Sequence, residues 1–257
     1  MTVYLVGAGP GSPDLLTLRA ARLIAAADIV VHDRLVDPRI LEMAPATATV
    51  IDAGKYSGGP SDAQAHINAV LVDAARRAAV VVRLKGGDPD GFGRGAEEAV
   101  ALRSAGVEVE VVPGVTSAIA GPAAAGIPVT MRGLSSGFTV VTGHQDPAGT
   151  DPLDWEALAR LGTTLVVLMG ASRAATIADR LLTAGMAPAT PVAAVESATS
   201  VEQRVLRTRL DELADLAEGT IRAPAVLVVG EVAGLDVADA EFGALVSEMA
   251  SETGGSR

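Results

Sequence analysis

The chain of 257 residues has no cysteine and only two lysines, Lys55 and Lys85. The absence of cysteine excludes disulfides, thiolate metal sites and a cysteine nucleophile, and it suits a reducing compartment. No apolar run approaches the roughly 20 residues that a membrane-spanning helix needs. Strand-like sequence begins at Val3 without a basic leader, so we expect no signal peptide. These absences predict a cytoplasmic protein that has no membrane partner.

Positive charge is also scarce, because the formal net charge is −11 at pH 7. Nucleic acid is therefore not an expected partner, since neutralising its phosphates requires a basic footprint. An anionic small molecule would have to meet a local cluster of basic side chains within an acidic shell. The length permits a sizeable core and two modest domains.

Strand-like and helix-like patterns alternate along most of the chain. Expected strands are 3–6, 28–31, 48–52, 79–84, 107–112, 137–142, 163–168, 191–196, 201–207 and 225–230. Expected helices are 13–26, 61–77, 95–105, 116–126, 154–160, 172–184 and 209–217. In the first helix, Ser12 is the expected N-cap and Pro13 the first helical residue. Continuous Val/Ile/Leu runs indicate strands that are covered on both faces.

Pro113 and Gly114 interrupt this alternation near the middle of the chain. We therefore expect two α/β domains, 1–113 and 114–235, with a small-molecule site in the cleft between them. Residues 236–257 show no clear pattern and are expected to form a flexible tail.

The most informative stretch is the apolar segment that runs from Val80 through Lys85 into Gly86-Gly87-Asp88-Pro89. Glycines allow a ligand to approach the backbone closely. The aspartate then stands at the carboxyl end of a strand, where open α/β sheets bind their ligands. Gly, Asp and Pro also dominate ordinary turns for local reasons. The segment alone is equally compatible with a turn and with a binding site.

The opening Val6-Gly7-Ala8-Gly9-Pro10-Gly11 is similar to a dinucleotide-binding fingerprint, and Asp33 falls where a ribose-binding acid would be expected. However, Ser12 stands where the third glycine should be, and Pro10 lacks the N–H that a pyrophosphate cradle would use. A nicotinamide- or flavin-dependent oxidoreductase is the alternative from another mechanistic class. Binding of NAD(P)H or a retained flavin spectrum would favour it.

Further motifs follow in a fixed order between residues 3 and 235. They include DRLV at 33–36, GGDP at 86–89, FGRG at 92–95, VVPGVTS at 111–117, GIPVTMRGL at 126–134, VTGH at 141–144 and PVAAVESATSVEQ at 191–203. In combination they resemble the tetrapyrrole methylases and, within them, the uroporphyrinogen-III C-methyltransferases. The resemblance implies a homodimer of two-domain α/β chains with the active site between the domains. It also implies methylation of uroporphyrinogen III at ring carbons 2 and 7, giving precorrin-2 for sirohaem or cobalamin biosynthesis.

The resemblance further implies that S-adenosylmethionine is the methyl donor and S-adenosylhomocysteine the product. Methyl transfer from a sulfonium needs no metal and no protein nucleophile, and the histidines are scattered, so we expect no metal site. Positions that match cofactor contacts in the family are Pro10, Gly86, Gly87, Asp88, Gly91, Thr116, Ser117, Met169, Ala198 and Ala225. Several have ordinary structural alternatives: Asp88 as a turn residue, Thr116 and Ser117 as helix N-caps, and Met169 as core filling.

The substrate is a polycarboxylate, so its site calls for planar, permanently charged donors. The resemblance implies substrate contacts from Arg34, Arg94, Glu97, Arg132 and Met169, and surface arginine is the alternative for each arginine. It also implies catalytic roles for Arg94, Asp33 and Lys55. A carboxylate among arginines has its charged form favoured and is a weak base, so Asp33 has a second interpretation, in which it orients Arg34.

The chain departs from the family pattern at several positions. Asp90-Gly91 stands where two apolar residues are usual, His32 replaces a common tyrosine, and Met131 replaces a common histidine; after Lys55 the sequence continues Tyr56-Ser57-Gly58. These changes loosen the substrate assignment more than the fold. Methylation of a later precorrin and non-enzymatic tetrapyrrole binding remain alternatives, which turnover with different tetrapyrroles distinguishes.

Overall fold

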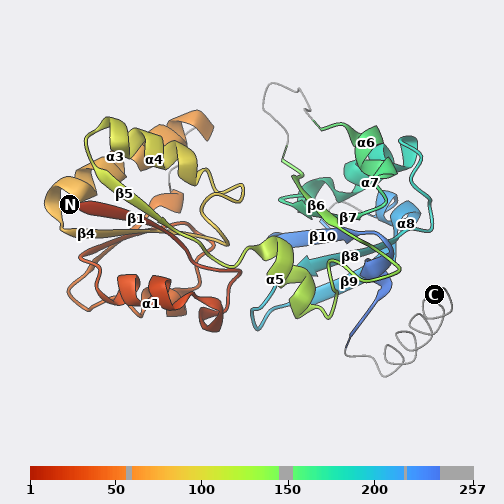
Figure 1. The fold of residues 1–257 in the computed structure, drawn as a ribbon, viewed down its shortest axis with the longest axis horizontal. Helices are drawn as coiled ribbons and strands as arrows, with labels where there is room; N and C mark the ends of the chain where they lie inside the picture. Colours follow the sequence, from red (N-terminus) through yellow and green to blue (C-terminus); the bar gives the residue numbers. More distant parts are fainter. Residues whose placement is uncertain (56–59, 145–152, 217–218, 238–257) are drawn as a thin grey trace, which may run out of the picture. The chain divides into compact units, whose positions relative to one another are not determined.

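The computed structural model describes residues 1–55, 60–144, 153–216 and 219–237 (Figure 1). The chain separates into two compact units, Met1–Ser117 and Ala118–Arg257. Within the described residues each unit contains one five-stranded sheet. The division falls a few residues after the predicted boundary at Pro113-Gly114. The predicted tail lies outside the described residues, except for its first two positions.

The first unit is organised around an all-parallel sheet in the order β3-β2-β4-β1-β5. Its strands are β1 (Thr2–Gly7), β2 (Ile29–His32), β3 (Thr49–Asp52), β4 (Val80–Lys85) and β5 (Glu108–Val112). Because the strands are parallel, their carboxyl ends meet at one edge of the sheet. The candidate residues that follow β1, β2, β4 and β5 therefore gather at that edge.

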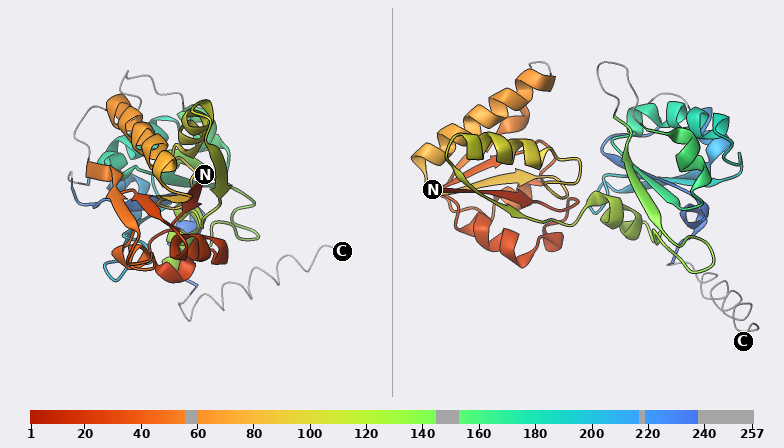
Figure 2. Two further views of the ribbon diagram at one scale, coloured as in Figure 1. Left: turned by 90° about the vertical axis from the view of Figure 1, so that its left-hand side faces the viewer. Right: turned by 45° about the horizontal axis from the view of Figure 1, so that its top comes forward.

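Helices cover both faces of this sheet (Figures 1 and 2). They are α1 (Leu18–Ala25), α2 (Pro38–Leu41), α3 (Pro60–Arg77) and α4 (Gly95–Ser104), with 3₁₀ turns η1 (Pro13–Leu15) and η2 (Ala53–Lys55). On one face, Leu71 of α3 and Leu102 of α4 pack against Val3 and its neighbours. On the other face, Ile24 of α1 packs against Val30 and its neighbours. The prediction of strands covered on both faces is confirmed for this sheet.

The predicted helix 13–26 is wrong at its start. Residues Pro13–Leu15 form a 3₁₀ turn, Leu16 is extended, and α1 begins only at Leu18. The N-cap of α1 is Thr17, whose hydroxyl accepts a hydrogen bond from the N–H of Ala20 at 3.1 Å, whereas Ser12 makes no side-chain cap bond. Both residue types favour N-caps, so composition alone did not distinguish them. The four-residue helix α2 is too short to show helical periodicity and was not predicted.

The second unit has a mixed sheet in the order β6-β7-β10-β8-β9. Its strands are β6 (Phe138–Thr142), β7 (Thr164–Leu168), β8 (Pro191–Glu196), β9 (Arg204–Arg209) and β10 (Ala225–Val229). Strands β6 and β7 are parallel, and the other neighbouring pairs are antiparallel. Its helices are α5 (Ser117–Ala124), α6 (Trp155–Arg160), α7 (Ala174–Thr183) and α8 (Leu210–Ala214), with 3₁₀ turns η3 (Ala171–Arg173) and η4 (Glu231–Gly234).

Apolar clusters cover both faces of this second sheet as well. Leu181 of α7 and Leu213 of α8 pack on one face, and Ala118 of α5 packs on the other. The expected strand 201–207 begins later, at Arg204, because the N–H of Ser200 and that of Gln203 close two successive turns first. Within the described residues, no helix is long and apolar enough to cross a membrane.

Candidate functional site

Three loops meet closely at the carboxyl edge of the first sheet. Gly9 and Gly87 form an isolated bridge, in which the N–H of each donates to the carbonyl of the other at 3.1 and 2.7 Å. A Cβ on Gly7 would lie 2.5 Å from the Cα of Gly114, and a Cβ on Gly114 would lie 2.3 Å from the carbonyl oxygen of Gly87. Gly7 at the end of β1 and Gly114 after β5 are therefore required for loop packing. This packing gives the opening glycine motif a structural reason independent of any dinucleotide.

Asp88 fixes the loop after β4. Its Oδ1 accepts from the N–H groups of Asp90 and Gly91 at 2.9 and 3.1 Å. Its Oδ2 accepts from the N–H of Gly114 at 3.0 Å, which ties the β4 loop to the β5 loop. The turn interpretation of Asp88 thus describes its geometry in this structure. The carboxylate of Asp88 can still accept a hydrogen bond from a ligand, because each carboxylate oxygen can accept more than one hydrogen bond.

Other predicted cofactor residues lie against the same loop. A Cβ on Gly87 would lie 3.5 Å from Oγ of Ser117 and 3.9 Å from the Cα of Thr116. A Cβ on Gly86 would meet nothing closer than Leu35, at 3.9 Å, so the backbone there is open. Pro10 is half-buried on the neighbouring β1 loop. The structure therefore brings together the predicted cofactor residues of the first unit.

The glycines that follow have different requirements. A Cβ on Gly91 would meet only Asp88, no closer than 3.7 Å, and Gly91 does not have a left-handed φ. A Cβ on Gly93 would lie 2.7 Å from the carbonyl oxygen of Pro89, and one on Gly95 would lie 2.6 Å from the same atom. Of these three glycines, only Gly93 and Gly95 need to be glycine for steric reasons. Gly91 is open to a larger side chain.

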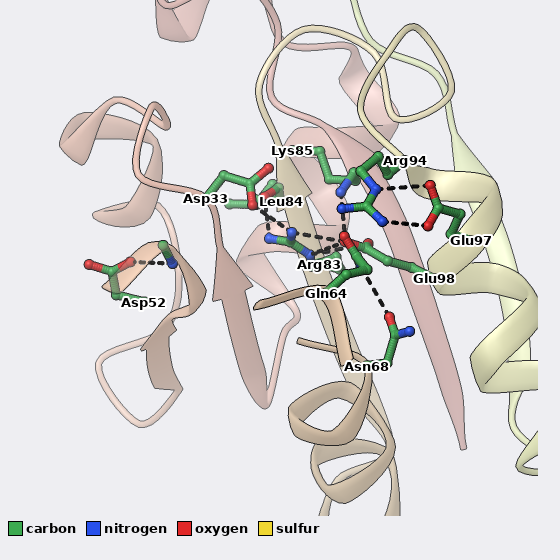
Figure 3. A network of polar contacts seen from close by, with 11 residues as sticks. Asp33, Asp52, Gln64, Asn68, Arg83, Leu84, Lys85, Arg94, Glu97 and Glu98 are labelled. Carbon is green, nitrogen blue, oxygen red and sulfur yellow. Dashed lines mark hydrogen bonds and ion pairs between the residues drawn. The ribbon is translucent and has the colours of Figure 1, made fainter. Parts of the chain in front are cut away.

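Arg94 lies in the turn between these glycines and has a left-handed φ of 60°. Its Nε and Nη2 donate to Oε1 and Oε2 of Glu97 at 2.8 and 2.7 Å (Figure 3). This charge-assisted pair raises the pKa of Arg94 and lowers the pKa of Glu97, through the hydrogen bonds first in each case. Both side chains are about half exposed. The guanidinium is held in one orientation while remaining accessible to an anion.

Asp33, at the end of β2, contacts a charged side chain that the sequence analysis did not single out. Nη2 of Arg83 donates to its Oδ1 at 2.5 Å. The Asp33 side chain is 34% exposed, and its Oδ2 has no hydrogen-bond partner among the described residues. In the second interpretation of Asp33, its carboxylate orients the side chain of Arg34, but Arg34 is exposed in this structure. The orienting partner of Asp33 in this structure is Arg83.

Arg83 belongs to a buried network with Lys85 and Glu98 (Figure 3). The side chains of Arg83, Lys85 and Glu98 are 1%, 2% and 0% exposed. Glu98 Oε1 accepts from Arg83 Nη2 at 3.0 Å, from Lys85 Nζ at 2.8 Å and from Gln64 Nε2 at 3.4 Å. One sequence signal could have indicated this network. Arg83 and Lys85 are spaced i and i+2 in an otherwise apolar strand, so both side chains lie on the same face of the sheet.

The electrostatics of this network follow from its burial. The pKa of Lys85 is lowered, because burial disfavours the ammonium and because Arg83 lies beside it. Burial alone would also lower the pKa of Arg83, but the carboxylates of Asp33 and Glu98 outweigh that effect and raise it. Arg83 is therefore the fixed positive centre of the network.

The second unit gathers its candidates at one end of its sheet. Met169 follows β7, Ala198 follows β8, and Ala225 begins the antiparallel β10 that lies between those two strands. Met169 is 51% exposed and has a φ of 56°. Ser197 and Thr199, on either side of Ala198, also have positive φ. Non-glycine residues in this region are uncommon and cluster at functional sites.

Two predicted residues are less well placed. Arg132 is exposed in a turn closed by Met131 and Ser135. The backbone of Lys55 lies in η2, but its side chain is outside the described part of the structure, as are residues 56–59. Their predicted roles stay predictions.

Comparison with known proteins decides the family. The model of the tetrapyrrole (corrin/porphyrin) methylases matches residues 2–214. The chain belongs to the tetrapyrrole methylases. The resemblance drawn from the sequence motifs and the two-sheet α/β fold class are both confirmed.

Among tetrapyrrole methylases, this chain is 52% identical over 232 residues to an S-adenosyl-L-methionine-dependent uroporphyrinogen III methyltransferase of Methanosarcina barkeri, covering 90% of this chain and 91% of the relative. It is 50% identical to a uroporphyrinogen-III C-methyltransferase of Pseudomonas aeruginosa, covering 90% and 93%. A siroheme synthase of Chromobacterium violaceum is 48% identical, but this chain spans only 49% of its length. Matches of this length extend over both units of the chain.

Solved structures of methyltransferases agree with the fold. The uroporphyrin-III C-methyl transferase of Thermus thermophilus, complexed with S-adenyl homocysteine, matches with a TM-score of 0.79 and 46% identity, covering 90% of this chain and 98% of that one. A cobalt precorrin-4 methyltransferase matches with the same TM-score but 28% identity, covering 91% and 96%. The fold is thus shared by methyltransferases named for different tetrapyrroles, and this chain is more similar in sequence to the uroporphyrin-III C-methyl transferase than to the cobalt precorrin-4 methyltransferase.

Two further observations concern metal binding and a surface hollow. Among the described residues, no group of three or more His, Asp or Glu side chains could hold a metal ion. A hollow of about 330 Å³ lies beside Trp155 and α7, where it is lined by Asp179 and Arg180. It touches none of the candidate residues. We therefore assign the candidate site from the strand-end loops rather than from this hollow.

Proposed function

We propose that this tetrapyrrole methylase transfers methyl groups from S-adenosylmethionine to ring carbons 2 and 7 of uroporphyrinogen III, giving precorrin-2 and S-adenosylhomocysteine. The observation that carries the proposal is the 50–52% identity to methyltransferases of uroporphyrinogen III over 90% of the chain. The strand-end loops of the first unit support it, because they combine open backbone with an oriented arginine.

The cofactor would be held mainly by backbone and small side chains. Gly86 and Gly87 present a loop without side-chain bulk, and Asp88 keeps that loop fixed to Gly114. Thr116 and Ser117 lie against Gly87. When bound, S-adenosylmethionine supplies an electrophilic methyl group on a positively charged sulfur. The family resemblance also assigns Met169, Ala198 and Ala225 of the second unit to cofactor binding, and these three residues lie at one end of its sheet.

The residues of this chain would contribute orientation and charge. Arg94 would bind a substrate carboxylate, with Glu97 holding its guanidinium in place and Arg34 and Arg132 neutralising further carboxylates. Such binding brings reacting atoms to about 3–3.5 Å, which supplies much of the acceleration. As the new carbon–carbon bond forms, the carbon–sulfur bond breaks and a proton leaves the macrocycle. Asp33, with Oδ2 unpaired within the described structure, and Lys55 are the proposed acid/base residues.

We also propose that the protein is a cytoplasmic homodimer and that its product serves sirohaem or cobalamin biosynthesis. The absence of cysteine and the family resemblance support the first part. The siroheme synthases that match this chain over about half of their length support the sirohaem branch. Sedimentation equilibrium measures the oligomeric state, and a monomeric mass at assay concentrations would contradict the dimer.

An anaerobic assay tests the proposed reaction. Uroporphyrinogen III is generated enzymatically and incubated with methyl-labelled S-adenosylmethionine, and the mass of the product is measured. We expect two labelled methyl groups on each macrocycle. Labelling of a later precorrin but not of uroporphyrinogen III would assign the alternative methylase activity. Labelling of no tetrapyrrole, with tetrapyrrole binding retained, would indicate a non-enzymatic binding protein.

A further inference from the structure

The first unit buries charged side chains in a core position that apolar residues could occupy. Arg83 and Lys85 extend from β4 on the sheet face covered by α3 and α4, where Glu98 of α4 meets them (Figure 3). The neighbouring residues of that face form an apolar cluster that includes Val81 and Leu102. Replacing a buried ion cluster by apolar residues of similar volume is often neutral or stabilising. Folding alone therefore gives a weak reason for these charges.

One end of this network reaches Asp33. Arg83 is the only side chain in the described structure that hydrogen-bonds the Asp33 carboxylate, through Nη2 and Oδ1 at 2.5 Å. The same guanidinium is fixed from behind, since its Nε donates to Glu98 Oε2 at 3.2 Å and its Nη1 donates to the carbonyl of Leu84 at 3.2 Å. Asp33 is thus attached to a donor that has little freedom to move.

The other end lies under the turn that carries Arg94. The Cε of Lys85 would be 3.3 Å from a Cβ on Gly93, so the lysine stem packs directly beneath the backbone there. The N–H of Glu98 donates to the carbonyl of Arg94 at 3.3 Å, while the adjacent Glu97 holds the Arg94 side chain. Glu98 contacts both Arg83 and Lys85 and therefore joins the two ends.

The charges explain why these particular residues form the connection. Arg83 and Lys85 carry two positive charges in their ionised forms, and Glu98 supplies one negative charge. The carboxylate of Asp33 supplies the second, at the partly exposed end of the network. Moving Asp33 away would leave a buried guanidinium with one carboxylate fewer, which is costly in a region of low dielectric. The network therefore resists displacement of Asp33.

We propose that Arg83, Lys85 and Glu98, here called the charged brace, are positioning residues that hold Asp33 and the Arg94 turn in a fixed mutual arrangement for methyl transfer. This inference rests on the proposed function, because it takes Asp33 and Arg94 as the groups that act on the tetrapyrrole. The side chains of the brace are buried. It acts through the two residues that it orients.

The main test replaces the whole brace by apolar residues, Arg83→Met, Lys85→Met and Glu98→Leu together. We expect this variant to fold and to bind S-adenosylhomocysteine within about threefold of wild type, since hydrogen bonds from Gly9 and Gly114 hold the cofactor loop independently. We expect kcat to fall by about 10²-fold, the loss that a displacement of about 1 Å can cause. A folded variant with wild-type kcat would overturn the proposal.

A second variant keeps the test informative if the triple variant does not fold. Glu98→Gln preserves shape and one acceptor but removes the charge that joins Arg83 to Lys85. It should retain cofactor affinity and lose at least about tenfold in kcat. The matched control is Leu102→Ala, in the same helix and fully buried, which should lower the thermal midpoint without lowering kcat at a temperature where it is folded. Equal kcat in Glu98→Gln and the control would contradict the brace.

Hydrogen exchange tests the proposed positioning role of the brace independently of the proposed reaction. If wild-type protein does not methylate any tetrapyrrole, the proposed function fails, but the positioning role is still measured by amide exchange. We expect segments 33–36 and 92–97 to exchange faster in the Glu98→Gln or triple variant than in Leu102→Ala at matched global stability. Unchanged exchange in both segments would overturn the brace whatever the activity.

Discussion

The two units differ in where their buried charged side chains lie. In the first, Arg83, Lys85 and Glu98 are buried together inside the core, beneath the loops that carry the candidate catalytic groups. In the second, among the described residues, the buried charged side chain is Glu196, which lies at a strand end and pairs with Arg204, a half-exposed residue. The second sheet, which is mixed rather than all-parallel, has no charge deep in the described part of its core. This difference is the one expected if the charged brace of the first unit has the positioning role proposed above.

The units are alike in how their strand-end loops are built. The described non-glycine residues with positive φ are Phe92 and Arg94 in the first unit, and Met169, Ser197 and Thr199 in the second. Each lies in a loop that contains or adjoins a candidate residue. Such conformations cost of order 1–3 kcal/mol each and persist where surrounding structure imposes them. Both units therefore hold their strand-end loops in strained shapes, but among the described residues a buried charge network lies beneath these loops only in the first unit.

The largest effect is expected for Arg94→Lys. An ammonium keeps the charge but cannot reproduce the planar fork that Glu97 orients, so turnover should fall by about 10²-fold with little change in S-adenosylhomocysteine affinity. The control is Arg209→Lys, an exposed ion-paired arginine at the opposite end of the second sheet from Ala198. Initial rates and calorimetry measure the two quantities. Near-normal turnover in Arg94→Lys would reduce Arg94 to a general electrostatic contributor.

The next effect is expected for Asp88→Ala, which should weaken cofactor binding by about 1.5–3 kcal/mol, as for loss of hydrogen bonds to a charged group. The variant loses its bonds to the β4 loop and to Gly114 as well as any ligand contact. Asp28→Ala is the matched control, since Asp28 also accepts two backbone N–H bonds, from Ala79 and Val80, but at the amino edge of the same sheet. Calorimetry with S-adenosylhomocysteine distinguishes them, and equal affinities in both variants would remove Asp88 from the cofactor site.

A smaller effect is expected at Gly91. Its backbone accepts a side chain, so Gly91→Val should tighten cofactor binding by about fourfold, corresponding to about 0.8 kcal/mol for one buried methylene. Gly93→Val should instead weaken binding, because its Cβ would lie 2.7 Å from the carbonyl oxygen of Pro89. Calorimetry on both variants measures the contrast. Weaker binding by Gly91→Val would show that the ligand needs the open space.

The smallest effect is expected in the second unit, for Glu196→Gln. The hydrogen bond from Arg204 lowers the pKa of Glu196, so its ionisation stabilises the fold above the unfolded value of about 4.3 and ceases to do so as pH falls through the folded pKa. The variant should be less stable at pH 7 and equal to wild type in strong acid. Denaturant unfolding at several pH values measures this, with Glu156→Gln in an exposed i,i+4 pair as the control. A stability difference that does not vary with pH would contradict the ion-pair explanation.

The sequence predicted most strands of both sheets, because continuous apolar runs and the glycines that end them are local signals. It also predicted which loops carry the first unit's candidates, since parallel strands share a carboxyl edge. It did not predict Thr17 as the first helix cap or the later start of β9 at Arg204, because both depend on turns between competing polar residues. These errors concern element ends, where neighbouring residues have similar preferences.

The sequence motifs predicted the residues of the candidate site, but they did not predict the buried and surface charges that contact those residues. Glu97 and Glu98 are adjacent in sequence, and only the phase of α4 turns one toward Arg94 at the surface and the other into the core. Arg83 likewise appears as one charge within an apolar strand until its contacts with Asp33 and Glu98 are visible. Whether an aspartate such as Asp88 shapes a loop or binds a ligand also requires its partners, and here it has three backbone donors.

The central claim is that the glycine-lined loops at the carboxyl edge of the first sheet bind the methyl donor. A crystal structure of the protein with S-adenosylhomocysteine bound tests it most directly. We predict contacts from the product to the Gly86–Asp88 loop and to Thr116 or Ser117. Density for the product away from those residues, with the Gly86–Asp88 loop uncontacted, would contradict it.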